Sequence, residues 1–283
     1  MQEIKYGLPN AYRKEYKMNL IVFFKKLIVK FIPELFYGSI LKLHFLNKLR
    51  AYSKNNEFEK LEPDLNIIKN LIKPGDSIID VGANFGFYTF YLSKLVGENG
   101  HVFSIEPIPL TFKILSNNVK KLALDNVSLF NCGISEQDGF AIMEIPKFDS
   151  GSENYYQAKI VNNVKQASSI RKIKVELRTI DSLLYDYCKK IAFIKIDAEN
   201  HEFQVINGAI KLISHLKPAL FVEVSENPDD KHSLAFELFN LLKNQGYSPY
   251  YYRDNKLWMR THGDKSINYF FLTNKQFQQI DKF

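Results

Sequence analysis

The chain has 283 residues, of which 46% are hydrophobic and 14% aromatic, so it is long enough for one large domain with a substantial core. Lys and Arg number 38 against 31 Asp and Glu, which gives a formal net charge of +7. The two cysteines, Cys132 and Cys188, lie far apart and show no metal-ligand spacing. A disulfide-rich secreted scaffold is therefore excluded, and reduced thiols in a cytoplasmic protein are expected.

The N-terminal segment is basic and carries a stripe of apolar residues. Twelve Lys or Arg and six Asp or Glu fall within residues 1–62. The longest apolar run, residues 19–36, is interrupted by three lysines and makes a poor membrane span. We expect residues 1–61 to form a helical extension that caps the main domain; the alternative is peripheral contact with the inner face of the membrane. No nucleic-acid-binding motif follows, so no nucleic-acid partner is expected.

Beyond residue 61, apolar strands alternate with helices of amphipathic spacing. Strands are predicted at 77–81, 101–107, 126–135, 140–146, 172–180, 191–197 and 218–226. Helices are predicted at 62–73, 85–96, 110–124 and 202–216, and the stretches 247–260 and 268–273 predict two further strands joined by an Asp-Asn turn. This alternation is typical of βαβ units. The sequence therefore predicts an α/β fold with a doubly wound, mostly parallel sheet, in one Rossmann-like domain over residues 62–283.

Three groups of polar residues follow predicted parallel strands. These are residues 80–86, Glu106 and residues 197–201. In a doubly wound sheet the carboxyl ends of the strands form one edge, and ligands bind there near the switch point. The uneven polar stretch 147–170 is rich in Tyr and Ile, so we expect a mobile loop that faces the substrate.

The stretch "IIDVGANFGFYT" is the strongest local signal. An apolar strand delivers Asp80, and Gly82 and Gly86 allow a tight turn into a helix. A dinucleotide-binding loop would have G-x-G-x-x-G, but Asn84 and Phe87 depart from that pattern. A carboxylate at the strand end repels a pyrophosphate and attracts an ammonium or sulfonium group. The loop therefore favours a cofactor without a pyrophosphate.

Glu106 ends the next strand, twenty residues after Gly86. An acidic residue at this place can accept hydrogen bonds from both hydroxyls of a ribose. The alternative is an acid that caps the helix after Pro107. Together with the glycine loop, Glu106 predicts a nucleoside-type cofactor, and an NAD(P)-dependent oxidoreductase remains an alternative.

The motifs "DVGANFGFYT", "VFSIEP", "NVSLFNCGISEQDG", "ELRTIDSLL" and "IAFIKIDAENHEFQVINGAIKLI" resemble the FkbM family of S-adenosylmethionine-dependent methyltransferases, over about residues 62–226. The resemblance implies a class I methyltransferase fold and methylation of hydroxyl groups, often on sugars or polyketide-type products. It implies that Asp80, Gly82, Asn84 and Gly86 surround the methionine part of the cofactor, that Glu106 holds the ribose, and that the turn 132–135 borders the adenine. The expected cofactor site also includes Ala83, Thr89, Pro107, Gly133 and Ile134.

The segment "IKIDAENHE" carries the candidate catalytic residues. A hydroxyl acceptor must lose its proton, which requires a base or a metal near the methyl group. We predict catalytic roles for Asp197, Lys195 and His201. Lys195 pairs with Asp197, stabilises a developing alkoxide or binds an acidic sugar, and the alternative for His201 is a histidine at a helix start that hydrogen-bonds a carboxylate. Glu199 and Glu202 suit a helix N-terminus by the helix-dipole argument, and Glu223 is a further strand-end acid expected near the acceptor.

No metal site is predicted. "HEFQV" lacks the second histidine of a zinc-binding H-E-x-x-H because position 205 is Val. A magnesium site built from Asp197, Glu226 and Asn227 is a weaker alternative. Asn200 stands where the family pattern has Gly. Two alternatives stay open: Asn preserves the turn, because it tolerates the left-handed backbone conformation better than most residues, or its amide contacts the acceptor.

The sequence thus predicts an S-adenosylmethionine-dependent O-methyltransferase that acts on a hydroxyl of a sugar, glycan or natural-product acceptor. Two alternatives stay open: an NAD(P)-dependent oxidoreductase, and a non-catalytic module that binds S-adenosylmethionine.

Overall fold

The computed structural model describes residues 34–55, 57–146, 153–154, 158–161, 170–184 and 190–280. In chain order its elements are α2 (Glu34–Asn55), α3 (Phe58–Leu61), α4 (Leu65–Leu71), β1 (Ser77–Val81), α5 (Phe87–Val96), β2 (His101–Ile105), α6 (Pro109–Lys121), β3 (Val127–Phe130), β4 (Gly133–Ile134), β5 (Gly139–Ile145), β6 (Lys159–Val161), β7 (Arg171–Arg178), α7 (Ile180–Leu184), β8 (Ile191–Ile196), α8 (Glu202–Asn207), α9 (Ile210–Leu216), β9 (Ala219–Glu223), α10 (Leu234–Asn244), β10 (Ser248–Arg253), β11 (Lys256–Met259), β12 (Asn268–Leu272) and α11 (Asn274–Ile280).

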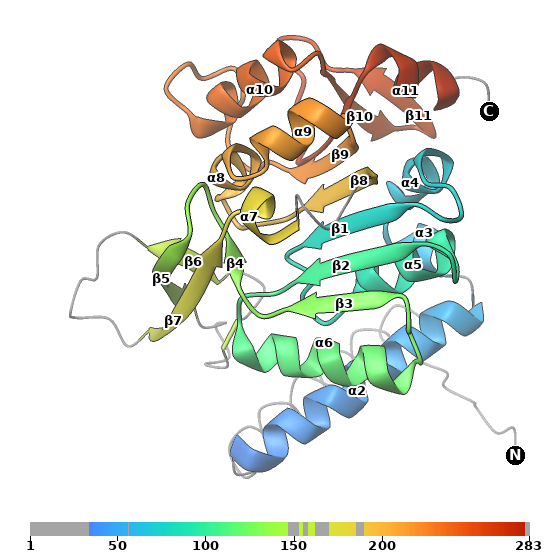
Figure 1. Ribbon diagram of the computed structural model, residues 1–283, viewed down its shortest axis with the longest axis vertical. Helices are drawn as coiled ribbons and strands as arrows, with labels where there is room; N and C mark the ends of the chain where they lie inside the picture. Colours follow the sequence, from blue (N-terminus) through green and yellow to red (C-terminus); the bar gives the residue numbers. More distant parts are fainter. Residues whose placement is uncertain are drawn as a thin grey trace, which may run out of the picture.

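The main sheet has eight strands in the order β11-β10-β12-β9-β8-β1-β2-β3. Strands β9, β8, β1, β2 and β3 are parallel, whereas β12, β10 and β11 pair in antiparallel fashion at one end. The chain runs outward from β1 to β3 and later returns to β8 on the other side of β1 (Figure 1). The predicted doubly wound, mostly parallel sheet is confirmed, and its switch point lies between β1 and β8.

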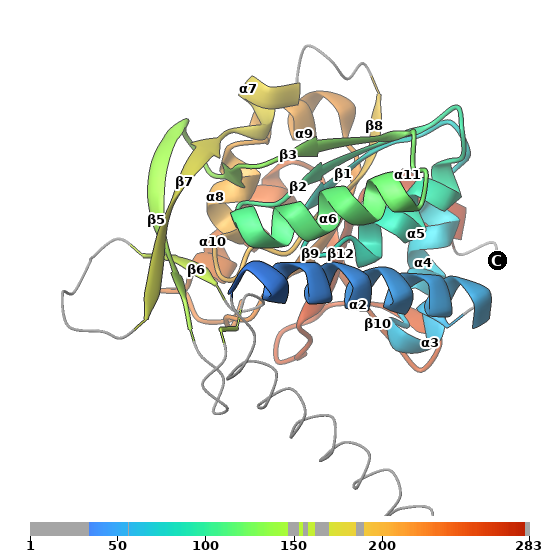
Figure 2. The same cartoon turned by 90° about the horizontal axis from the view of Figure 1, so that it is seen from below.

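Helices cover both faces of this sheet (Figure 2). Successive strand residues point to opposite faces, so the fully buried Ile78 and Ile79 of β1 belong to different core clusters. Helices α7 to α10 pack on the face of Ile79, and α2 to α6 with α11 pack on the face of Ile78. Each fully buried isoleucine contributes about 1.5–3 kcal/mol to folding, which is why continuous apolar runs form the central strands.

A second sheet, in the order β4-β7-β5-β6, lies beside the carboxyl ends of the main strands (Figure 1). The sequence predicts one strand over 126–135, but the chain breaks after Phe130, so β3 joins the main sheet and β4 the second. The predicted mobile loop 147–170 lies largely outside the described residues. Within it, β6 pairs with β5, so this part is a strand rather than a loop.

The helix predicted over 202–216 is two helices, α8 and α9. They separate at Gly208, where a Cβ would overlap the backbone carbonyl of Ser135. The C-terminal part contains three strands rather than two, and the predicted Asp-Asn turn joins β10 to β11 with both turn residues in the left-handed region. Helices α7, α10 and α11 were not predicted from the sequence, and α7 begins at Ile180, the last residue of the strand predicted over 172–180.

Helix α2 covers 22 residues of the expected N-terminal extension. It packs on the core through buried Leu46 and Leu49, and the Phe45 ring stacks on Phe85 at 4.4 Å between centroids. Residues 57–61, with α3, are also described, whereas residues 1–33 and 56 lie outside the described residues. A separate cap over 1–61 therefore stays a prediction. Among the helices that the structure describes, none is both long and apolar enough to cross a membrane.

Candidate active site

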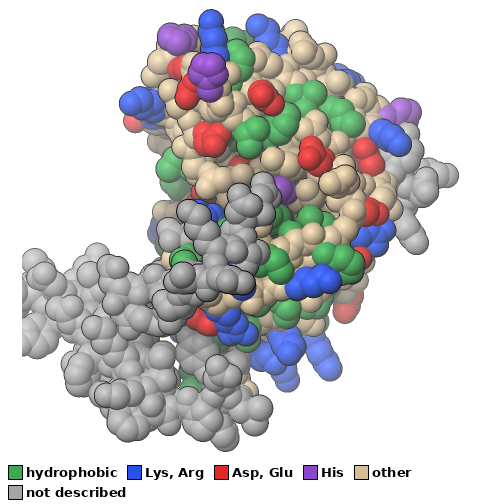
Figure 3. Space-filling model, turned by 90° about the vertical axis from the view of Figure 1, so that its left-hand side faces the viewer, with side chains coloured by type: hydrophobic (Ala, Val, Ile, Leu, Met, Phe, Trp, Pro, Cys, Tyr) green, Lys and Arg blue, Asp and Glu red, His purple; other side chains and the backbone are tan. Residues whose placement is uncertain are grey.

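A cavity of about 270 Å³ opens at the carboxyl edge of the main sheet. Its walls come from the loops after β1, β2, β8 and β9 and from the second sheet. Figure 3 shows this side of the molecule. Asp and Glu side chains are visible at several places on the part of this face that the structure describes. The cavity therefore lies where a doubly wound sheet binds its ligands.

The glycine loop after β1 forms one wall. Gly82, Asn84 and Gly86 all have positive φ, at 72°, 50° and 97°. The side-chain Oδ1 of Asn84 accepts a hydrogen bond from the Phe85 N–H at 2.8 Å, which stabilises the left-handed conformation at a position that a dinucleotide loop gives to glycine. The Asn84 N–H donates to Glu106 Oε2 at 3.0 Å and fastens the loop to the end of β2.

Glu106 lies in the cavity wall and is only 4% exposed. Its Oε1 accepts a hydrogen bond from the N–H of Ile108, the residue before α6, at 2.9 Å, and so fixes the chain where it enters this helix. Burial raises the pKa of Glu106 to about 7, against the effect of its two backbone hydrogen bonds. Each carboxylate oxygen still has a free lone pair, which a ribose hydroxyl can use.

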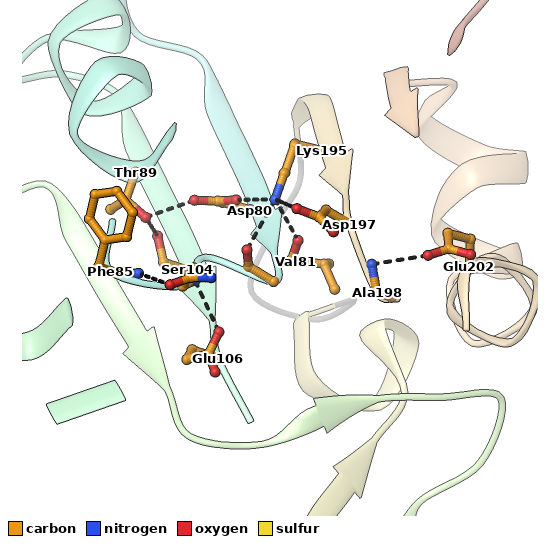
Figure 4. Close-up of polar contacts among 12 residues, drawn as sticks. Asp80, Val81, Phe85, Thr89, Ser104, Glu106, Lys195, Asp197, Ala198 and Glu202 are labelled. Atoms are coloured by element: carbon orange, nitrogen blue, oxygen red, sulfur yellow. Dashed lines mark hydrogen bonds and ion pairs between the residues drawn. The ribbon is translucent and has the colours of Figure 1, made fainter. Parts of the chain in front are cut away.

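A buried polar network runs across β8, β1 and β2 behind the cavity. The parallel register sets Lys195 beside Asp80 and Asp80 beside Ser104. The Thr89 hydroxyl, from α5, donates to Asp80 Oδ2 at 2.7 Å and lies 3.0 Å from the Ser104 hydroxyl. Lys195 Nζ is 3.7 Å from Asp80 Oδ1 (Figure 4). Burial raises the pKa of Asp80, opposed by Lys195 and Thr89.

Lys195 connects this buried network to the residues of the cavity wall. Its Nζ donates to the carbonyls of Val81 and Gly82 at 3.3 and 3.0 Å and to Asp197 Oδ2 at 3.3 Å (Figure 4). Burial lowers the pKa of Lys195, but Asp197 and Asp80 outweigh that effect and raise it. The predicted pairing of Lys195 with Asp197 is confirmed. With these donors engaged and 3% exposure, Lys195 is placed to position Asp197 rather than to touch an acceptor.

The structure divides the predicted site residues into two groups. Those in the cavity wall are Gly82, Asn84, Glu106, Pro107, Gly133, Ile134, Asp197 and His201. Those behind the wall are Asp80, Ala83, Gly86, Thr89 and Lys195. Asp80 was expected to meet a cationic cofactor; its charge instead faces the Lys195 ammonium, because the strand register pairs the two side chains on a buried face.

The turn after β8 has two consecutive left-handed residues, Glu199 (φ 51°) and Asn200 (φ 71°). Glu202 Oε1 accepts hydrogen bonds from the N–H groups of Ala198 at 3.1 Å and Asn200 at 3.0 Å. Burial raises the pKa of Glu202 to about 7 in spite of these bonds. The turn therefore keeps its left-handed conformation with Asn at position 200.

His201 lies in the cavity wall, and its Nε2 is 3.0 Å from the Ser135 hydroxyl. Burial lowers its pKa, so the imidazole is neutral near pH 7. This contact joins the turn after β8 to the end of β4 and holds the two sheets together at the site.

Several residues that line the cavity were not predicted from the sequence. Glu199, assigned only a helix-dipole role, lines the cavity, while α8 begins at Glu202. Burial, Asp197 and Glu223 raise the pKa of Glu199 to about 7. Met143, Ala158 and Ile160 enter from the second sheet, and only the long-range pairing of β5 with β6 brings them there. Glu223 was not missed: it was expected near the acceptor from its place at a strand end, and it ends β9 and lines the cavity.

The weaker magnesium alternative meets no support in the described part of the chain, where no three His, Cys, Asp or Glu side chains gather as a metal site would require. Glu226 Oε2 accepts a hydrogen bond from the Ala235 N–H at 3.2 Å, at the start of α10. Asn227 Oδ1 accepts one from the Asp229 N–H at 3.1 Å.

The cavity fits S-adenosylmethionine better than a phosphorylated cofactor. Among the described residues no Lys or Arg side chain lines it, whereas Asp197, Glu199 and Glu223 do. These carboxylates attract a sulfonium or ammonium group and repel phosphates. Glu106 offers oxygens to a ribose, and the apolar Ile108 and Ile134 offer a surface to a purine ring.

The doubly wound sheet and the acidic cavity at its switch point are the features expected of an S-adenosylmethionine-dependent methyltransferase of class I fold. The family model for the methyltransferase FkbM domain matches residues 80–249, which is more than half of the chain. The protein therefore belongs to the FkbM methyltransferase family.

Other known methyltransferases share parts of the chain. A protein-L-isoaspartate O-methyltransferase of Methanococcus aeolicus is 34% identical over 62 residues, 22% of this chain and 28% of that protein. The ribosomal RNA large subunit methyltransferase E of Wigglesworthia glossinidia brevipalpis is 26% identical over 156 residues, 50% of this chain and 70% of that protein. The crystal structure of methyltransferase FkbM from Methylobacillus flagellatus KT has a TM-score of 0.45 and 19% identity, covering 69% of this chain and 43% of that one. The first of these curated relatives is matched over less than a third of its length.

Proposed function

We propose that this protein transfers a methyl group from S-adenosylmethionine to a hydroxyl of a sugar, glycan or natural-product acceptor. The observation that carries the proposal is one continuous cavity. It joins the ribose-accepting Glu106 to the acidic wall of Asp197, Glu199 and Glu223. The carboxylates at that end can accept hydrogen bonds from the several hydroxyls of a polyol.

Alignment of the acceptor is the main contribution expected from the protein. When bound, S-adenosylmethionine supplies a methyl group on a positively charged sulfur. Effective molarities of about 10⁵–10⁸ M are reached when two reacting groups are held in line, so rigid walls matter. Lys195 holds both Asp197 and the carbonyl of Gly82, and thereby sets the distance between two of these walls. Asp197 and His201 are proposed to contact the acceptor hydroxyls.

The charge of the wall favours a neutral or cationic acceptor. At an effective dielectric constant of about 20, two like charges about 4 Å apart repel by about 4 kcal/mol. A phosphate group beside Asp197, Glu199 or Glu223 would meet this repulsion. This argues for a glycan rather than a nucleic acid, although one relative is named a ribosomal RNA methyltransferase. A cytoplasmic location, with the basic segment 1–61 near the inner membrane face, belongs to the same proposal.

A transfer experiment tests the function. Purified protein is incubated with methyl-labelled S-adenosylmethionine and a glycan extract from cells that lack the protein, and the glycans are then analysed by mass spectrometry. We expect labelled glycan and an equal amount of S-adenosylhomocysteine. Cofactor binding without any S-adenosylhomocysteine would favour the non-catalytic module, and binding of NAD(P) alone would favour the oxidoreductase.

A further inference from the structure

We propose that Glu199 is the general base that takes the proton from the acceptor hydroxyl, and that Glu202 positions it. The inference rests on the proposed methyl transfer, because only a hydroxyl acceptor has to lose this proton.

Glu199 and Glu223 are the two carboxylates of the cavity wall whose side chains have no hydrogen-bond or ion-pair partner within the described residues. Glu223 ends β9, one strand further from the glycine loop, whereas Glu199 lies on the turn after β8, which pairs directly with β1. Asp197 instead uses its Oδ2 to accept a hydrogen bond from the Lys195 ammonium at 3.3 Å. His201 is engaged with the Ser135 hydroxyl. The carboxylate of Glu199 is therefore the one best placed to receive a proton.

Burial is the largest reason why Glu199 is more basic than an ordinary glutamate. The charges of Asp197 on the same turn, Glu223 at the end of β9 and Glu202 at the start of α8 also oppose its ionisation. Lys195 on β8 acts in the opposite direction. Their balance raises the pKa of Glu199 to about 7, where a general base is most effective at neutral pH.

The turn after β8 has an unfavourable backbone conformation, which other contacts have to stabilise. A left-handed conformation costs about 1–2 kcal/mol for a residue with a Cβ, and Glu199 and Asn200 both adopt it. The Glu202 carboxylate holds the N–H groups on either side of Glu199, those of Ala198 and Asn200. Figure 4 shows the Ala198 bond, which spans the turn. Glu202 is 7% exposed, so it acts through the turn and not on the acceptor.

The reaction needs only the acceptor hydroxyl, Glu199, the methyl donor and water. The acceptor hydroxyl gives its proton to a carboxylate oxygen of Glu199, and its oxygen forms a bond to the methyl carbon. The bond between that carbon and sulfur breaks, and sulfur keeps the electron pair and becomes neutral. Protonated Glu199 then returns the proton to water.

Three variants test the role of Glu199 in the labelled-glycan assay described above. Glu199→Gln removes the base and keeps the shape, Glu199→Ala leaves space for formate, and Glu98→Gln changes an exposed glutamate in the loop between α5 and β2, at the opposite edge of the sheet. We expect Glu199→Gln to transfer methyl groups about 10²-fold more slowly, since general base catalysis contributes about 10²–10⁴-fold. Formate should restore part of the activity of Glu199→Ala. Glu98→Gln should match the wild type.

The pH profile and cofactor binding distinguish a wrong assignment of Glu199 from a wrong proposed function. At saturating S-adenosylmethionine, where the pH dependence of cofactor binding through Glu106 no longer affects the rate, the wild-type rate should rise with pH through about 7, as Glu199 ionises. This rise should be absent in Glu199→Gln. Binding of S-adenosylhomocysteine by calorimetry should be the same in both proteins. Wild-type rates and pH profile in Glu199→Gln, or no formate rescue in a Glu199→Ala variant that still binds S-adenosylhomocysteine, would overturn the role of Glu199. If the wild type itself transfers no methyl group, the proposed function fails instead.

Discussion

The backbone carbonyl of Asp197 lies in the space that a Cβ on Gly82 would occupy. The Asp197 N–H also donates to the Val81 carbonyl at 3.2 Å, so the ends of β8 and β1 are in direct contact. This contact brings the glycine loop and the turn after β8 together as two walls of one cavity. It depends on the absence of a side chain at residue 82.

Gly82→Ala should therefore move Asp197 and open the cavity. We expect a loss of about 1–3 kcal/mol in the free energy of unfolding from overpacking, and a clear loss of S-adenosylmethionine affinity in calorimetry. Gly246→Ala is the matched control, because Gly246 also has a positive φ but a Cβ there would meet no atom within 4 Å. The control should lose stability and keep its affinity. Equal affinity in both variants would contradict the proposed contact.

Lys195→Met should destabilise the fold strongly. The substitution leaves Asp80 buried without its counter-charge, and breaking a buried ion pair costs about 3–5 kcal/mol. Urea unfolding measures the loss. The double variant Asp80→Asn with Lys195→Met should recover part of it, because the uncompensated carboxylate is gone. A loss below about 1 kcal/mol in the single variant would show that the network contributes little.

Cofactor binding should depend on pH through Glu106. Ribose hydroxyls donate to the ionised carboxylate, so binding below pH 7 must release the proton that the raised pKa retains. Affinity should rise between about pH 6 and pH 8, with proton release visible in buffers of different ionisation enthalpy. Glu106→Gln should bind about 10- to 100-fold more weakly, the value of a charge-assisted hydrogen bond, and lose most of this pH dependence. An unchanged pH profile would argue against ribose at Glu106.

The same pKa has a consequence for stability. The folded-state pKa of Glu106, about 7, is above its ordinary value of 4.5, so the folded protein holds this proton more tightly than the unfolded chain. Its contribution to the free energy of unfolding is present in full below about pH 4.5 and is lost as pH rises through about 7. Urea titrations at about pH 5 and pH 8 should show this decrease, and it should be smaller in Glu106→Gln.

Asn200 should tolerate glycine but not alanine. Its φ of 71° costs a residue with a Cβ about 1–2 kcal/mol, and Asn bears this conformation better than Ala. Asn200→Ala should lose about 1 kcal/mol in urea unfolding, whereas Asn200→Gly should stay close to the wild type. In a Glu202→Ala background, which lacks the carboxylate that holds this turn, Asn200→Gly should restore part of the methyl-transfer rate. Equal losses for Ala and Gly would mean that backbone conformation is not the constraint.

The strand ends of the site could be predicted from sequence because their signals are local. Buried strand β1 is predicted at its observed bounds, and strand parity predicts that Lys195 and Asp197 share a side. The strand-end rule brings Glu106 and Asp197 to one cavity. Each of these inferences needs only a few neighbouring residues.

The remainder depends on contacts between distant segments. The register of β8 against β1 decides that Lys195 neutralises Asp80, and no local pattern gives a register. The second sheet forms because β5 pairs with both β6 and β7, and this pairing brings Met143 and Ile160 to the cavity. The role of Glu199 depends on where α8 begins, and a helix boundary is uncertain by a few residues in any sequence-based prediction.

Calorimetric titration with S-adenosylmethionine tests the central claim most directly. The wild type should bind the cofactor, and it should not bind NAD(P) at the same concentrations. Gly82→Arg, which fills the contact with Asp197, and Glu106→Ala, which removes the ribose partner, should abolish or greatly weaken binding. A wild type that does not bind S-adenosylmethionine, or two variants that bind it as the wild type does, would contradict the account.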